Sequence, residues 1–308
     1  MEKKILVAID GSVYSSNSLD YLIRLFNKDT NLSIHLISIV SSAGGDQNWM
    51  MDVDPLRTQS PATERRTRTA IKYLKDAKAR LLRNGFTEEQ VTFSTETTSS
   101  AIAIAIHHEA NRGLYDGLLV GRRGVGKVGE MFFGSVSSHL IEHCHEIPLW
   151  LIDGEVTSNR FLLAVHSLPA SLMAADHLSY IMQANKKAKV CLYHSSSLFK
   201  NKPNADPVDF HEQWGKQWCE DHLDIENFLF HAHAQILMDN GVEKKRISQL
   251  QMRMDIDVSH DLLRQAKKHH CGTIVIGRRG RNVNKGLLGG VSDRTMQYAQ
   301  NMAVWQVG

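Results

Sequence analysis

The sequence predicts an α/β protein built from two tandem doubly wound domains, each with a five-stranded, mostly parallel sheet and helices on both faces. Three observations lead to this prediction. Short apolar runs alternate with helical patterns, which is typical of parallel sheets covered by helices. The runs are continuously apolar, as strands buried on both faces require. The whole pattern then occurs twice within 308 residues, a length that favours about two domains.

An internal repeat relates the two halves. Ile5–Ile9 resembles Phe161–Val165 at an offset of 161 − 5 = 156. Gly121–Gly124 recurs as Gly277–Gly280, and 277 − 121 is again 156. Two equal offsets so far apart indicate a duplication.

A third match locates the domain boundary. Pro148–Trp150 corresponds to Ala303–Trp305 at an offset of 303 − 148 = 155, so we expect the preceding loop of the second half to lack one residue. We predict domains at residues 1–153 and 159–308, with the seam near Asp153 to Asn159.

The elements of the first half follow in order from periodicity and capping signals. The expected strands are 5–9, 32–40, 91–95, 117–120 and 149–152. The expected helices are one that Ser15 or Ser16 caps, one at 63–84 that Gly85 ends, one that Ser99 or Ser100 caps, and one at 134–144. The polar stretch 41–62, with its prolines, is expected to be a loop.

Composition excludes several classes of protein. The formal net charge is only +3 and the apolar content 42%, so we expect no nucleic-acid partner. The N-terminus has no signal-peptide pattern and no run of about 18 apolar residues occurs, so we expect no membrane contact. Four scattered cysteines favour a reducing compartment. The expected location is the cytoplasm.

The stretch Gly121–Ser135 carries the candidate chemistry, because it joins the fourth strand to the last helix. Its glycines allow the backbone to approach a ligand closely. The first amides of a helix that starts at Gly134 and Ser135 lie at the positive end of the helix dipole and favour phosphate. Ser135 and Ser137 offer hydroxyl donors. Arg122 is either a phosphate clamp or a solvated loop residue.

Two common motifs overlap this stretch without fitting it. Gly121–Lys127 has the spacing of a P-loop, but Val128 stands where the Mg²⁺-binding hydroxyl is required. Gly124, Gly126 and Gly129 match a dinucleotide fingerprint but follow the fourth strand, not the first. Sixteen histidines do not form a zinc pattern, and we expect no metal site.

A GxxG motif followed, after nine residues, by Gly-Ser resembles the signature of the ATP-binding universal stress proteins. Gly121, Gly124, Gly134 and Ser135 fit it without a gap, and Ile5–Ser12 resembles the first strand of that family with its acidic residue. The order of elements in both halves resembles the tandem members of the family.

The resemblance implies a role for each matching position. Asp10 would lie near the adenine, although an Asp after a strand is by itself more often a turn or cap residue. The resemblance implies that Ile39 contacts the base through its backbone. Gly121 and Gly124 would lie along the ribose and phosphates, with Arg122 beside them. Gly134, Ser135 and Val136 would contact the phosphates. Family members also pair through the fifth strand, so the halves are expected to form an intramolecular pseudo-dimer, and a homo-oligomer is a further possibility.

The second half departs from this pattern. His166 stands where the first half has Asp10, and eight residues separate Gly280 from Gly289, with Gly290 in place of the serine. We therefore expect a degenerate nucleotide site there. The sequence as a whole predicts a cytoplasmic stress-response protein that binds ATP, with or without Mg²⁺, or another adenine nucleotide in its first half. It would act as a nucleotide-dependent regulatory or interaction module with unidentified protein partners. A slow ATPase and a nucleotide-free scaffold are the alternatives, and no catalytic residue is assigned.

Overall fold

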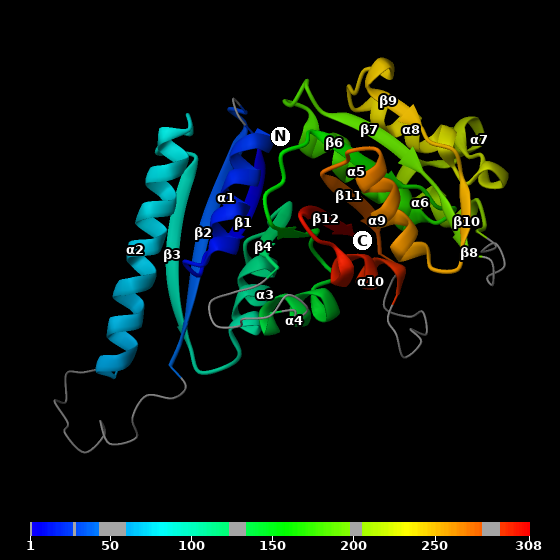
Figure 1. Ribbon diagram of the computed structural model, residues 1–308. Coiled ribbons are helices and arrows are strands. Elements are labelled where there is room, and N and C mark those ends of the chain that lie inside the picture. Colours follow the sequence, from blue (N-terminus) through cyan, green and yellow to red (C-terminus); the bar gives the residue numbers. More distant parts are fainter. Residues whose placement is uncertain (1, 27–28, 43–59, 123–133, 198–204, 279–289) are drawn as a thin grey trace. The chain divides into compact units, whose positions relative to one another are not determined.

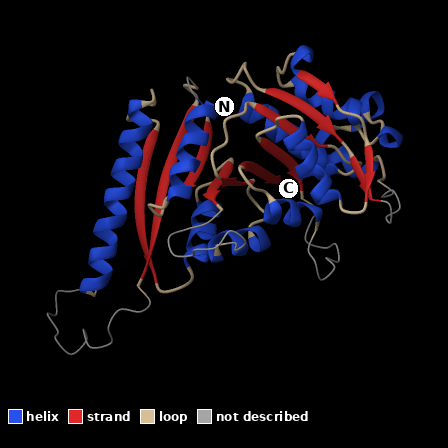
Figure 2. Cartoon of the chain, in the orientation of Figure 1, coloured by secondary structure: helices blue, strands red, loops and turns tan. Residues whose placement is uncertain are grey.

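The computed structural model describes residues 2–26, 29–42, 60–122, 134–197, 205–278 and 290–308. The chain forms two compact units, Met1–Asp153 and Gly154–Gly308, and each is described by itself. Residues 154–158, the expected seam, belong to the second unit, where Ser158 Oγ donates to the His270 carbonyl oxygen at 2.7 Å. The predicted fold class is confirmed in both units (Figure 1, Figure 2).

The first unit contains one parallel sheet in the order β3-β2-β1-β4-β5. Its strands are β1 (Lys3–Ala8), β2 (Leu32–Ser41), β3 (Val91–Thr98), β4 (Gly117–Gly121) and β5 (Leu149–Asp153). Their side chains alternate between the two faces, and most are buried because helices cover both faces. The Trp150 ring stacks on Phe26 of this unit, with ring centroids 6.2 Å apart.

Within the described part of this unit, four helices cover the sheet, two on each face. They are α1 (Val13–Phe26), α2 (Pro61–Arg83), α3 (Ile102–Arg112) and α4 (Ser135–His143). Helices α1 and α2 contact each other on one face, and α3 and α4 contact each other on the other. Ser60 caps α2 and Pro61 begins it, a position that tolerates proline because the first amides have no partner within the helix.

The second unit repeats this plan, with the parallel order β12-β11-β6-β7-β9. Its strands are β6 (Arg160–Ala164), β7 (Lys189–Tyr193), β9 (Ile247–Gln249), β11 (Thr273–Gly277) and β12 (Met302–Val307), with a separate pair β8 (Ser195–Ser197) and β10 (Arg253–Asp255). Its main helices are α5 (Pro169–Met182), α8 (Phe230–Asp239), α9 (Val258–Lys268) and α10 (Val291–Tyr298). The short helices α6 (Val208–Trp214), α7 (Lys216–His222) and η2 (Ile225–Asn227) precede α8, and η3 (Lys244–Arg246) follows it. No helix within the described ranges is both long and apolar enough to cross a membrane.

Two of the predicted helix caps are wrong. Helix α1 begins at Val13, and Ser12 Oγ accepts from the Ser15 amide at 3.2 Å, so Ser12 rather than Ser15 or Ser16 caps it. Helix α3 follows Ala101, and no side chain in the described ranges caps it. The Ser100 hydroxyl instead bonds Thr98 Oγ1 at 2.8 Å. Cap positions depend on how the preceding strand ends, and periodicity does not record that.

The half-buried His177 and the fully buried His233 make the second unit sensitive to acid. Burial lowers the pKa of His177 to about 3 and that of His233 to about 4. In the unfolded chain both return to 6.5, so below that pH the unfolded state binds protons that the folded state refuses. Stability is therefore full above pH 6.5 and falls as the pH drops towards the folded values. We expect a loss of about 1 kcal/mol per histidine between pH 6.5 and 5.5.

Urea unfolding of the chain at several pH values measures this loss. The substitution His177→Leu removes one titrating group and should flatten the pH dependence by about half. An unchanged slope in that variant would contradict the assignment.

Candidate functional site

The loops after β1 and β4 lie at the switch point of the first sheet. Strand β1 occupies the centre, with β2 on one side and β4 on the other. The connection after β1 leads to β2 on one side, and the connection after β3 crosses back to β4 on the other side. Crevices form at the carboxyl ends of the strands at such a point, and ligands of open α/β sheets bind there. Asp10 follows β1, and Gly121 ends β4.

Asp10 forms a tight turn at this edge. Its Oδ1 accepts from the Ser12 amide at 2.9 Å and from Ser12 Oγ at 2.6 Å, and the side chain stays exposed. Gly11 follows with φ of 78°, and a Cβ there would lie 2.2 Å from the Tyr73 ring. The turn therefore requires glycine. Tyr73 of α2 is partly exposed beside it, and sequence periodicity had not singled it out as a site residue.

The backbone of β2 extends past the end of β1. The Ile9 amide donates to the Ile37 carbonyl oxygen at 2.8 Å, after which the chain turns away at Asp10. Groups two residues apart in a strand face the same neighbour, so the amide and carbonyl of Ile39 face the side that β1 has left. This is the position from which a strand backbone can hydrogen bond the edge of a planar base.

Gly121 lets β4 end against the start of α1. A Cβ at Gly121 would lie 2.9 Å from Tyr14 Cβ and 3.0 Å from the Tyr14 carbonyl carbon. Ser137 of α4 fixes this exit, because its buried hydroxyl lies 3.0 Å from the carbonyl oxygens of both Gly121 and Arg122. The expectation that Ser137 offers its hydroxyl to phosphate is therefore wrong. Ser137 positions the loop.

Arg122 turns inward. Its side chain is 4% exposed, and Nη1 lies 3.6 Å from Asp153 Oδ2 at the end of β5. Its amide also donates to the Ile152 carbonyl oxygen at 2.9 Å. The guanidinium is thus buried rather than in a solvated loop. Burial of a charge requires a partner of opposite sign, which Asp153 provides. The backbone of Arg122 still lines the exit from β4.

The amino end of α4 completes the set. Gly134 is the N-cap residue, and its amide lies 3.3 Å from the Arg122 carbonyl oxygen. Ser135 and Val136 are the first two helical residues, and Ser135 is exposed. No side chain of the described residues caps this end, and such amides favour anions. Gly124, and the rest of 123–133, lie outside the described residues.

The substitution Ser137→Ala tests this arrangement. We expect it to lower the free energy of unfolding by about 1 kcal/mol, because two carbonyl oxygens lose a buried donor. Urea denaturation measures the change. Ser138, one residue along and exposed, provides the matched control Ser138→Ala. Equal stability of the two variants would show that the Ser137 hydrogen bonds contribute nothing.

The second unit keeps the same backbone geometry. A Cβ at Gly277 would lie 2.2 Å from the Ala170 carbonyl oxygen, the counterpart of the approach of Gly121 to Tyr14. The N-cap residue of α10 is Gly290, at an offset of 290 − 134 = 156 from Gly134. The two helices nevertheless end at His143 and Tyr298, an offset of 298 − 143 = 155, and their buried residues Ser137 and Ser292 keep the same offset. The chain therefore loses one residue between Gly277 and Ser292, where the sequence predicts the deletion.

A carboxylate occupies the amino end of α10. Asp293 Oδ2 accepts from the Gly290 amide at 3.3 Å, and Asp293 Oδ1 accepts from Gln306 Nε2 at 2.8 Å. Arg278, buried like Arg122, lies 3.8 Å from the same Asp293 oxygen. In the second half, the Asp293 carboxylate thus supplies the negative charge at the helix amino end that a bound phosphate would supply in the first half.

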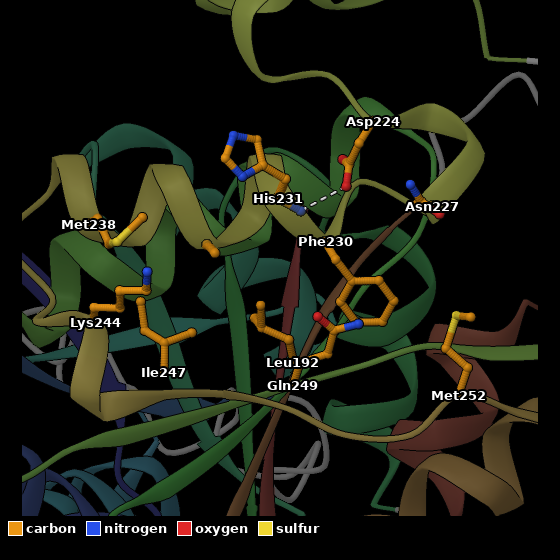
Figure 3. Close-up of a pocket in the computed structure, with 11 residues that line it drawn as sticks. Leu192, Asp224, Asn227, Phe230, His231, Met238, Lys244, Ile247, Gln249 and Met252 are labelled. Atoms are coloured by element: carbon orange, nitrogen blue, oxygen red, sulfur yellow. Dashed lines mark hydrogen bonds between the residues drawn. The ribbon is translucent and has the colours of Figure 1, made fainter.

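The described residues of the second unit contain a cavity. It has a volume of about 470 Å³ and lies in the second unit between α8, η2 and β9 (Figure 3). Phe230, Leu192 and Ile247 line its middle, and Asp224 lies at one end, where its carboxylate accepts from the His231 amide at 2.8 Å. Burial raises the pKa of Asp224. Among the described residues, no three His, Cys, Asp or Glu side chains are grouped to hold a metal ion.

Comparison with known proteins identifies the family of the first half. Residues 1–152 match the model of the universal stress protein family. Comparison with curated proteins found no match.

Solved structures that match nearly the whole chain include the following three. A universal stress protein from Archaeoglobus fulgidus has 16% sequence identity and a TM-score of 0.64, and the match covers 98% of this chain and 97% of that one. A functionally unknown protein from Pseudomonas aeruginosa has 14% identity and a TM-score of 0.56, with coverage of 99% and 92%. A putative universal stress protein from Pseudomonas aeruginosa has 12% identity and a TM-score of 0.53, with coverage of 99% and 92%. At such low identity these structures show the fold. The first half of this chain belongs to the universal stress protein family, and its second half repeats the fold of that family.

Proposed function

We propose that the first half binds one ATP, or a related adenine nucleotide, in the crevice between the loops after β1 and β4. The observation that carries this proposal is the convergence of three features at one switch point. These are the Asp10 turn, the β2 backbone at Ile39 that β1 no longer covers, and the amino end of α4. The first two suit a base and the third suits phosphate.

The ligand would lie with its base between Asp10 and Ile39, and with its phosphates at Gly134, Ser135 and Val136. The exposed Tyr73 ring beside Gly11 lies at the same edge. Where Mg²⁺ accompanies ATP, it would be held by the phosphates, as is common for this ion.

The second half is proposed to reject nucleoside phosphates. Asp293 places a carboxylate where the first phosphate would lie, and it already bonds Gly290, Gln306 and Arg278. A phosphate would have to displace or neutralise this group against like-charge repulsion. A chain in which one half binds nucleotide and the other rejects it is suited to signal nucleotide binding to partner proteins. We place this module in the cytoplasm.

The test is to denature the purified chain and identify any released nucleotide by chromatography. We expect an adenine nucleotide at up to one per chain. If none is released, binding of added ATP is followed by saturation-transfer NMR. No released nucleotide and no transfer from millimolar ATP would overturn the proposal.

A further inference from the structure

A strained turn brings Phe228 over the carboxyl edge of the second sheet. Phe228 and the next residue, Leu229, both have left-handed backbones, with φ of 59° and 62°. Residues other than glycine adopt this conformation rarely, because Cβ crowds the backbone. The Leu229 amide donates to the Asp224 carbonyl oxygen at 3.1 Å, and His233 Nδ1 donates to the Leu229 carbonyl oxygen at 2.6 Å. Such strain persists only where the surroundings hold it.

The turn places the Phe228 ring flat against His194. The two ring centroids are 3.7 Å apart, at an interplanar angle of 19°. His194 follows β7, and its Nδ1 donates to the Val165 carbonyl oxygen after β6 at 2.8 Å. The ring of His166 lies 5.9 Å from that of His194. Phe228 thus covers the point where the loops after β6 and β7 meet.

The internal repeat identifies this point with the base end of the crevice in the first half. At the offset of 156, His166 corresponds to Asp10 and His194 to Ser38, the residue before Ile39. In the first half Asp10 and Gly11 are exposed. In the second half Ser167, the counterpart of Gly11, is 3% exposed, and its hydroxyl lies 3.3 Å from the Ile225 carbonyl oxygen in the turn. The same edge is therefore open in one unit and covered in the other.

We propose that the edge formed by His166 and His194 is a second binding site, for a planar heteroaromatic ring without phosphates, and that Phe228 occupies it until the ring is displaced. The identification of this edge as a base site rests on the function proposed for the first half. Flat stacking on an imidazole is the contact that a purine base would make with His194. The ligand would be a base or nucleoside, because Asp293 occupies the neighbouring helix end where a phosphate would bind.

The experiment compares the full chain with its Phe228→Gly variant, using adenosine as the probe. Glycine removes the ring and accepts the left-handed backbone. Two-dimensional proton–carbon NMR of the histidine rings reports binding, with the signals of His166 and His194 assigned by substitution. We expect adenosine to shift the His194 signals in the variant, with an affinity at least tenfold higher than in the unchanged chain. If the glycine variant fails to fold, Phe228→Asn is used, since asparagine also tolerates this backbone.

The exposed neighbour Asn227 supplies the control Asn227→Gly, which loosens the same turn but keeps the ring. It should behave as the unchanged chain does. Three results would overturn the proposal: no shift of His194 in either Phe228 variant at millimolar adenosine, equal binding by the unchanged chain, or equal binding by Asn227→Gly. The His194 readout lies in the second half, so a failure of ATP binding by the first half would be seen separately, by titration with ATP.

Discussion

The substitution Ser135→Asp is expected to weaken ATP binding at least about thirtyfold while leaving the fold intact. Ser135 is the exposed first residue of α4, so a carboxylate there would lie among the amides that we assign to phosphate. Two like charges at about 4 Å repel by several kcal/mol near a protein surface, and about 2 kcal/mol suffices for this loss. An acidic residue in the first turn also stabilises the helix, because its negative charge interacts favourably with the helix dipole. Binding and stability should therefore change in opposite directions.

Calorimetric titration with ATP and thermal unfolding measure the two effects on the same samples. The matched control is Val291→Asp, which places the charge at the first position of α10 in the second half. It should leave ATP affinity unchanged. If Val291→Asp weakens binding and Ser135→Asp does not, the site has been placed in the wrong half.

The substitution Gly277→Ala is expected to destabilise the second unit by about 3 kcal/mol or more, at the upper end of single substitutions. The new Cβ would lie 2.2 Å from the Ala170 carbonyl oxygen and 2.4 Å from its carbonyl carbon. These are backbone atoms at the start of α5, so relief requires that helix and β11 move apart. Urea unfolding followed by circular dichroism measures the loss.

Gly290→Ala is the matched control for this prediction. A Cβ at Gly290 would meet its nearest atoms at 3.8 Å, and the backbone there has φ of −78°, which any residue adopts. Its stability should stay within about 0.5 kcal/mol of the unchanged chain. Stability losses of equal size in the two variants would mean that α5 yields freely, against the packing described.

The sequence predicted the fold well because the fold is recorded in continuous apolar runs. The run Ile5–Ile9 corresponds to β1 at Lys3–Ala8, and the expected helix at 63–84 is α2 at Pro61–Arg83. Repetition at an offset of 156 extended the same prediction to the second unit. The GxxG and Gly-Ser pattern led to the family, which the match over residues 1–152 supports.

Side-chain direction was less predictable, because it depends on partners distant in sequence. Arg122 is buried by Asp153, 153 − 122 = 31 residues further along, and nothing in the local motif signals that pairing. Ser137 lies next to the proposed phosphate amides yet points back to Gly121. Tyr73 reaches Gly11 only because α2 packs beside α1. The assignments of Asp10, Ile39, Gly121, Arg122, Gly124, Gly134, Ser135 and Val136 to nucleotide stay predictions.

The proposed rejection of nucleoside phosphates by the second half rests on a contact that the sequence pattern does not show. A glycine pair at Gly289 and Gly290 resembles a weakened phosphate loop. The stronger support for the proposed exclusion is Asp293, the third residue of α10, which is bonded to Gly290 and Gln306. An acidic residue is common at the third position of a helix. Whether it excludes a ligand depends on what that end of the helix faces.

The most direct test of the account is the number of ATP molecules bound per chain, measured by isothermal titration calorimetry on the full chain after removal of any bound nucleotide. We expect one ATP per chain, bound at least about thirtyfold more weakly by Ser135→Asp and with unchanged affinity by Val291→Asp. Two per chain, or one that survives Ser135→Asp and disappears in Val291→Asp, would contradict it.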